Sequence, residues 1–172
     1  MIIKAGIFAK NARFFFLKGE TDMKLAEALG ERADLQKRIE QLRTRLENNA
    51  KVQEGEKPNE DPAELLAELD SCCERLEELI IRINHTNSVA VTDGETLSAI
   101  IAKRDVLTMK IAAIRALLAS ANMNIRRMSG SEVKILPTVN VRAMQKDLDK
   151  LSKQLRETDT KLQGANWNTD LI

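Results

Sequence analysis

The chain has 172 residues, of which 31% are charged and 43% are hydrophobic, and only 3% are aromatic, with no tyrosine. Lysine and arginine number 27 against 26 aspartates and glutamates, and this balance excludes a general attraction to nucleic acid or anionic lipid. A core poor in aromatic rings has to be built from aliphatic side chains, which favours helices packed on helices.

Residues 1–22 form an oily leader with four cationic and two acidic side chains. It lacks the long apolar stretch and small-residue cleavage site of a secretory signal, although a basic amphipathic anchor is one interpretation. Another starts from Lys18-Gly19-Glu20, which can be encoded by the purine run that bacterial ribosomes recognise before a start codon. We therefore expect translation to begin at Met23, which leaves 23–172 as a single helical domain.

The first two predicted helices follow from apolar residues that recur every three or four positions. The first runs from Met23 to about residue 50, and a loop with Gly55 and Pro58 follows it over 51–60. Asp61 and Pro62 have the residue types of a helix cap and a first helical position. The second helix should end near 84–87, with an apolar face that Leu66, Cys73 and Ile80 widen.

The third predicted helix starts near a Thr96 cap and extends to about residue 121, and the fourth starts at Asn140 and should stop at Gly164. Two of the segments that connect the predicted helices have the composition of short strands. Residues 88–92 are β-leaning, and residues 132–139 alternate apolar and polar side chains like an edge strand. The two segments are expected to pair as a small β-element.

The predicted fold class is therefore mainly all-α. It is an elongated bundle of four long helices in antiparallel coiled-coil-like hairpins, each helix about 40 Å long at ~1.5 Å per residue. Narrow apolar stripes leave much side area exposed, so we expect a homo-oligomer.

Several segments resemble a bacterial family of small helical proteins described as septicolysin-like. They include MKLAEAL, ERADLQKRIEQL, RINHTN, DGETLSAIIAKRDVL and the closing TKLQGANWNTDLI. The resemblance covers Met23 to Ile172 and contains no known catalytic signature. Its label implies cytolysis by a membrane-active protein.

No catalytic or metal-binding constellation stands out. His85 is the sole histidine and lies near a predicted helix end, where an imidazole commonly complements the helix C-terminus. The adjacent Cys72 and Cys73 cannot easily bridge each other, and no other ligand supports a metal site. Unbridged cysteines favour a reducing, cytoplasmic location, and we expect no cofactor.

One set of polar residues falls where the pattern predicts burial or a junction. Its members are Arg104, Asp105, Asn84, Thr86, Asn87, Lys134, Asn166 and Trp167. A charge inside an apolar stripe must pair or face an opening, because burying it alone is costly. The set is interpreted as a structural network that ties the tail to the bundle. The alternative is a pocket for a small anionic ligand, bound by Arg104 and Lys134.

The leading functional hypothesis is a non-enzymatic scaffold or binding protein that self-associates. A membrane-active cytolysin is an alternative suggested by the resemblance and the leader, and membrane contact is expected only in that case. A small-anion-binding module is the third hypothesis.

Overall fold

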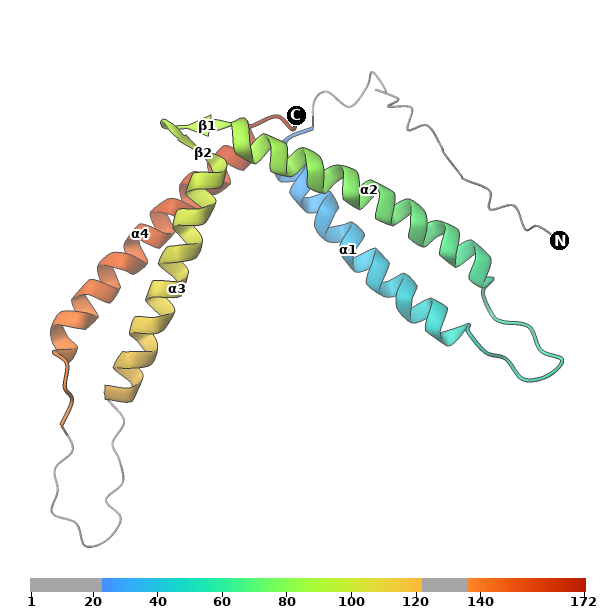
Figure 1. Ribbon diagram of the computed structural model, residues 1–172, viewed down its shortest axis with the longest axis horizontal. Coiled ribbons are helices and arrows are strands. Elements are labelled where there is room, and N and C mark those ends of the chain that lie inside the picture. The colour runs from blue at the N-terminus through green and yellow to red at the C-terminus, as the bar shows by residue number, and fades with distance from the viewer. Residues whose placement is uncertain (1–22, 122–135) are drawn as a thin grey trace, which may run out of the picture.

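The structure, a computed structural model, describes residues 23–121 and 136–172. In chain order it contains α1 (Leu25–Asn48), α2 (Pro62–Val89), β1 (Val91–Thr92), β2 (Glu95–Thr96), α3 (Leu97–Ala121) and α4 (Val141–Asn168). Helix α1 packs along α2 and α3 packs along α4, and the two hairpins diverge from a common apex as an inverted V (Figure 1). The prediction of a mainly all-α fold built from long helical hairpins with a minor β-element is confirmed.

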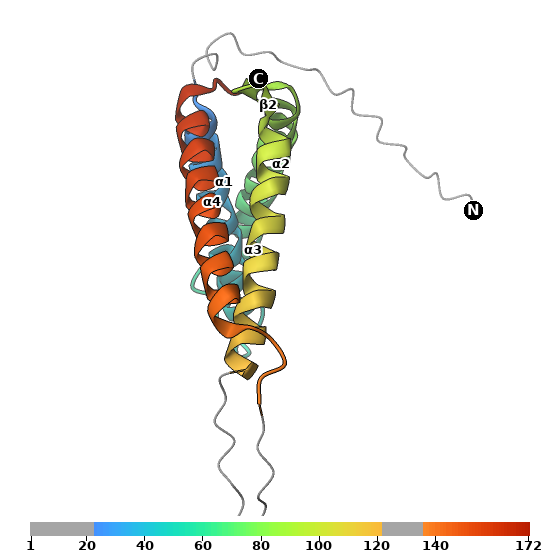
Figure 2. The same cartoon turned by 90° about the vertical axis from the view of Figure 1, so that its left-hand side faces the viewer.

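The four helices lie on two sides of the V. Seen edge-on, α2 and α3 lie on one side of the molecule, and α1 and α4 lie on the other (Figure 2). We call the first side the α2–α3 face. We call the α1–α2 hairpin the first arm and the α3–α4 hairpin the second arm.

Three helix starts are capped as predicted. The side chain of Asp61 accepts a hydrogen bond from the Ala63 N–H at 2.9 Å, with proline at the first helical position. Thr96 Oγ1 accepts from the Ala99 N–H at 3.3 Å, and Asn140 Oδ1 accepts from the Ala143 N–H at 3.0 Å. Each cap satisfies a backbone donor that has no partner inside the helix.

Two predicted helix ends are wrong. Helix α2 continues to Val89, past the range 84–87, and Gly164 lies inside α4, which ends at Asn168. Ala165 is buried in the apex core and its carbonyl accepts the Thr169 N–H, so tertiary packing of the last turn outweighs the low helix propensity of glycine.

The β-element that the structure describes is a local hairpin within residues 91–96, formed without the expected 132–139 partner among the described residues. Strand β1 pairs antiparallel with β2, and the turn between them is Asp93-Gly94. Both turn residues have positive φ, 50° and 81°, which is the geometry of a tight two-residue hairpin that Asp-Gly sequences favour. Residues 136–139 form no strand, and residues 132–135 lie outside the described residues.

The main core lies at the apex, where all four helices meet. Leu79, Ile83, Leu97 and Ile100 are each 1% exposed or less. They pack with residues from α1, α4 and the C-terminal tail, namely Leu25, Ala28, Leu162, Ala165 and Leu171. Away from the apex the buried set thins out, and the second arm retains a small cluster of Ile111, Leu118 and Leu148.

The two ends of the described fold are joined at the apex. Leu25 N–H donates to the Thr169 carbonyl and Leu171 N–H donates to the Met23 carbonyl, both at 2.9 Å. Thr86 is fully buried beside them, and its Oγ1 accepts the Ile172 N–H at 2.9 Å. The hydroxyl also donates to the Arg82 carbonyl, so this threonine fastens the tail to α2.

A second polar contact closes the turn between α1 and α2. The Asn49 amide is buried, donates to the Arg45 carbonyl at 2.9 Å and accepts the Glu60 N–H at 3.1 Å. Arg45 Nε lies 3.1 Å from both carboxylate oxygens of Glu60. This hydrogen bonding from Arg45 lowers the pKa of Glu60 below its ordinary value.

We predict that Thr86→Val lowers the free energy of unfolding by about 1–2 kcal/mol, because the Ile172 N–H loses its acceptor in a half-buried position. Urea denaturation followed by circular dichroism measures the change. Thr108→Val is the matched control, since Thr108 makes the same helical bond, to the Arg104 carbonyl at 2.9 Å, from an exposed position. Equal losses in both variants would show that the tail contact contributes nothing.

We predict that Glu60→Gln makes the protein less stable at neutral pH and flattens its acid sensitivity. A carboxylate whose pKa is lowered by folding contributes stability above the ordinary glutamate pKa of about 4.3, and that contribution is lost as the pH falls through the lowered value. Thermal unfolding between pH 7 and pH 3 measures it. Two curves that stay parallel over this range would contradict the assignment.

Candidate functional site

An open depression of about 930 Å³ lies between the β-hairpin and the C-terminal half of α4. Lys153, Arg156 and Lys161 line it from α4, and Asp93 lines it from the hairpin turn. Residues 153, 156 and 161 share a side of α4 because a helix repeats every 3.6 residues. The depression therefore combines a cationic helix surface with an acidic turn.

Lys161 is the most constrained charge in this depression. Its Nζ lies 3.1 Å from Glu95 Oε2 and 3.4 Å from Asp93 Oδ2. The hydrogen bond to Glu95, reinforced by the Asp93 carboxylate, raises the pKa of Lys161 above its ordinary value. Lys161 therefore anchors the hairpin to α4, and its charge is largely neutralised by these two carboxylates.

The other charged side chains of the depression resemble those of an ordinary protein surface. Lys153 forms a 3.8 Å ion pair with Glu157, and no histidine, cysteine or serine is among the described residues that line the depression. In residues 23–121 and 136–172, no group of three His, Cys, Asp or Glu side chains is placed to hold a metal ion. His85 is exposed on α2, away from this lining.

The predicted polar set is dispersed. Arg104 is 37% exposed and donates to Asp105 Oδ1 from both Nε and Nη2, at 3.0 and 2.7 Å, so its partner is its neighbour on α3. Lys134, the other half of the expected anion pocket, lies outside the described residues.

The rest of the set lies near the apex, with different degrees of burial. Thr86 is buried and bonded to the tail, whereas Asn84 is exposed and Asn87 is half-buried. Asn166 is half-buried and Trp167 is 63% exposed on the last turn of α4. Among these residues, Thr86 makes the contact between tail and helix that a structural network requires.

The residues of the β-hairpin were missed by sequence reasoning. Asp93, Glu95 and Lys161 come together because the tight turn folds β2 back beside β1, next to α4. The signal was present in the sequence, since an Asp-Gly pair that follows Val91-Thr92 and precedes Glu95-Thr96 is a strong hairpin indicator.

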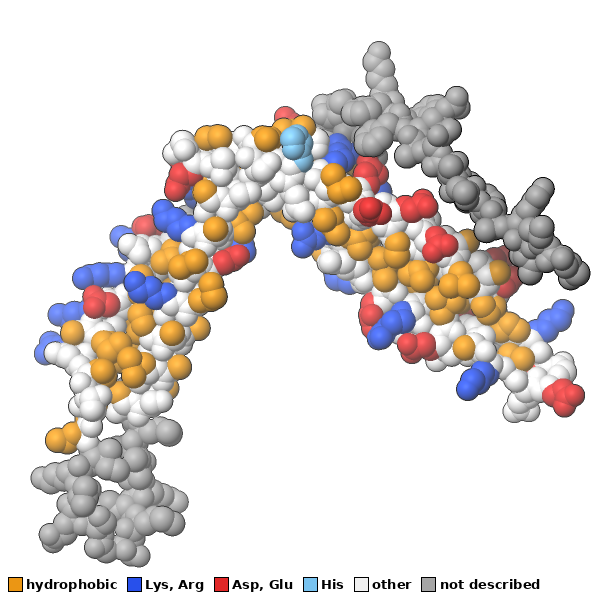
Figure 3. Space-filling model, viewed as in Figure 1, with side chains coloured by type: hydrophobic (Ala, Val, Ile, Leu, Met, Phe, Trp, Pro, Cys, Tyr) orange, Lys and Arg blue, Asp and Glu red, His pale blue; other side chains and the backbone are white. Residues whose placement is uncertain are grey.

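Apolar side chains remain uncovered along the α2–α3 face. On α2, Leu66, Cys73 and Ile80 recur every seven residues and are exposed, so the expectation that they widen the buried face is wrong. On α3, Val106 is 58% exposed and Met109 is 65% exposed. Figure 3 shows hydrophobic side chains along both arms on this side of the molecule.

The two arms carry opposite net charge. Helices α1 and α2 together contain eleven acidic and seven basic side chains, a net of −4. Helices α3 and α4 contain five acidic and ten basic side chains, a net of +5. The near-neutral total of the whole chain therefore conceals a strong asymmetry between its halves.

No helix in the described part of the chain has the combination of length and apolar character that crossing a membrane requires.

Comparison with known proteins gives one family and one solved structure. The model of a family of unknown function, DUF6847, matches residues 32–171. A crystal structure of a functionally unknown conserved protein from Corynebacterium diphtheriae is 38% identical, with a TM-score of 0.82. The similarity covers 88% of this chain and 99% of that chain. No curated protein matches this chain significantly.

These matches correct the expected resemblance to septicolysin-like proteins. Neither the family model nor the solved structure carries that description, so the label and the cytolytic activity it implied have no support. Because the family model spans most of the sequence, the chain belongs to DUF6847, a family of unknown function.

Proposed function

We propose that this protein is a non-enzymatic helical scaffold or binding protein that self-associates through its α2–α3 face. The observation that carries the proposal is the composition of α3. This helix buries Ile100, Ile111 and Leu118 against its neighbours, yet presents Val106 and Met109 on its opposite side. A helix with apolar side chains on two opposite sides has a second surface that a further helix could bury.

The construction of the arms supports the same conclusion. Each arm is only two helices thick away from the apex, so few of its apolar side chains are completely buried. Leu35, Ile39, Leu69 and Leu76 in the first arm are only half-buried, and so are Ile114, Leu151 and Leu155 in the second. Covering these arms with further helices would bury apolar surface at about 25 cal/mol per Å².

In the depression near the apex, the ammonium group of Lys161 is paired with Asp93 and Glu95, which supports a structural role for this lysine. Cys72 and Cys73 are free thiols, which fits a reducing compartment such as the cytoplasm.

We predict that Val106→Asp combined with Met109→Asp abolishes self-association and leaves the helix content unchanged, because both side chains are exposed in the single copy. Sedimentation velocity between about 1 and 100 µM, a range that covers typical moderate affinities, measures the association. Val52→Asp is the control, since Val52 is 49% exposed on the α1–α2 loop, away from this face. A wild-type chain that stays monomeric throughout this range would refute the proposal.

A further inference from the structure

We infer that two intact copies of this chain associate through their α2–α3 faces, so that the acidic α1–α2 arm of each copy lies against the basic α3–α4 arm of the other. We call this arrangement arm exchange. The contact places α2 of one copy on α3 of its partner, twice, in a twofold-symmetric dimer. This inference rests on the proposed self-association and specifies its surfaces, its partner and its symmetry.

The shape of the molecule permits this arrangement. Helices α2 and α3 lie on the same side of the V, one in each arm (Figures 1 and 2). A twofold axis along the bisector of the V, just outside the α2–α3 face, places each arm of one copy against the opposite arm of the other. Such an isologous contact closes on itself and leaves no open end for further growth.

Charge selects opposite arms over like arms. The first arm has a net charge of −4 and the second of +5, so contact between like arms would bring charges of one sign together. On α2, Asp70 and Glu77 flank the apolar residues Leu66, Cys73 and Ile80, and on α3, Lys103 and Lys110 lie seven residues apart beside Val106 and Met109. Complementary charges around an apolar strip are the pattern expected of specific helix pairing.

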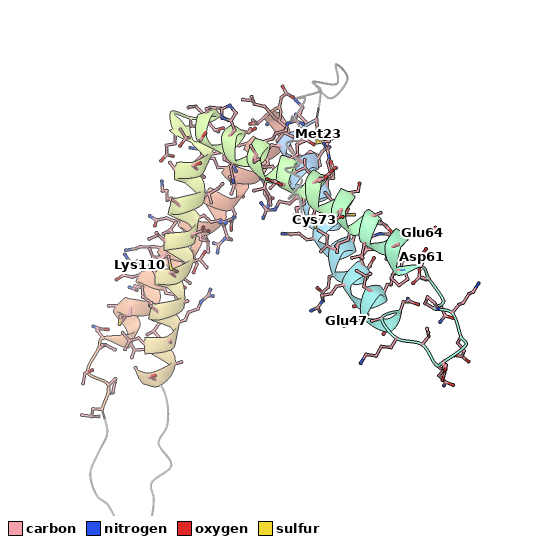
Figure 4. The ribbon with its side chains drawn as sticks, turned by 45° about the vertical axis from the view of Figure 1, so that its right-hand side comes forward. Met23, Glu47, Asp61, Glu64, Cys73 and Lys110 are labelled. Atoms are coloured by element: carbon pink, nitrogen blue, oxygen red, sulfur yellow. The ribbon has the colours of Figure 1, made fainter. Side chains whose placement is uncertain are left out.

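The apolar positions also match along the arms. Ile80 precedes the last residue of α2, Val89, by nine residues, and Val106 follows the first residue of α3, Leu97, by nine. Cys73 and Ala113 are each sixteen residues from the same two ends, or about 24 Å at ~1.5 Å per residue. When the apices of both copies lie on the twofold axis, Cys73 of one copy and Ala113 of the other are at the same distance from the apex. Figure 4 shows Cys73 and Lys110 part-way along their respective arms.

The first test uses charge reversal in the full chain. Asp70→Lys with Glu77→Lys makes the first arm less acidic, and Lys103→Glu with Lys110→Glu makes the second arm less basic. Each double variant alone should raise the dimer dissociation constant by roughly tenfold or more, because symmetry counts every reversal twice. An equimolar mixture of the two variants should restore dimerisation, since the lysines introduced on α2 of one variant then face the glutamates introduced on α3 of the other. Lys146→Glu with Lys153→Glu, on the other side of the second arm, is the matched control and should change the constant much less.

The second test uses the native thiol of Cys73. Under mild oxidation, Ala113→Cys should yield a covalent dimer that additional replacement of Cys73 by serine abolishes. The wild-type chain should give little covalent dimer, because each Cys73 faces α3 of the partner and the two Cys73 residues lie far apart, on opposite sides of the twofold axis. Non-reducing electrophoresis and intact-mass measurement detect the product.

The outcomes separate this inference from the proposed function. Weakened association in both charge variants, rescue on mixing and a Cys73-dependent cross-link would support arm exchange. Charge variants that dimerise as tightly as the wild type, or a wild-type dimer cross-linked through Cys73 alone, would overturn arm exchange and leave self-association intact. A wild-type chain that is monomeric at about 100 µM would overturn both.

Discussion

The structure depends on burial of one apolar cluster at the apex of the V. Leu25, Leu79, Ile83, Leu97 and Ile100 come from three helices and are almost completely removed from water. A fully buried leucine or isoleucine contributes about 1.5–3 kcal/mol relative to exposure, so this cluster supplies much of the cohesion between the two hairpins. Polar groups complete the junction, since Thr86 receives the tail and Lys161 holds the β-hairpin.

The arms are organised differently from the apex. Each is a pair of helices that buries a few contact residues, such as Leu42 and Ile111, and leaves others partly in water, and α3 carries apolar side chains opposite its own packing surface. The apex therefore holds the two hairpins together, whereas the arms leave apolar side chains exposed and carry opposite net charges.

Several polar residues that looked functional in the sequence have local structural partners. Arg104 bonds to Asp105 beside it, and Thr86 bonds to the chain terminus and to its own helix. The depression beside α4 is likewise bounded by charges that pair with one another. These charges are therefore used locally, in ion pairs within the chain.

The sequence by itself determined the elements. Three- and four-residue apolar spacing predicted four helices, and the caps at Asp61, Thr96 and Asn140 predicted three of their starts, because both signals are local. The tertiary structure decided what local signals do not contain. Gly164 stays helical because Ala165 is buried, and β1 pairs with β2 across the Asp93-Gly94 turn. Leu66 and Ile80 are exposed because α1 covers only one side of α2, and an apolar residue in a helical repeat does not reveal which neighbour, in the same chain or another, will cover it.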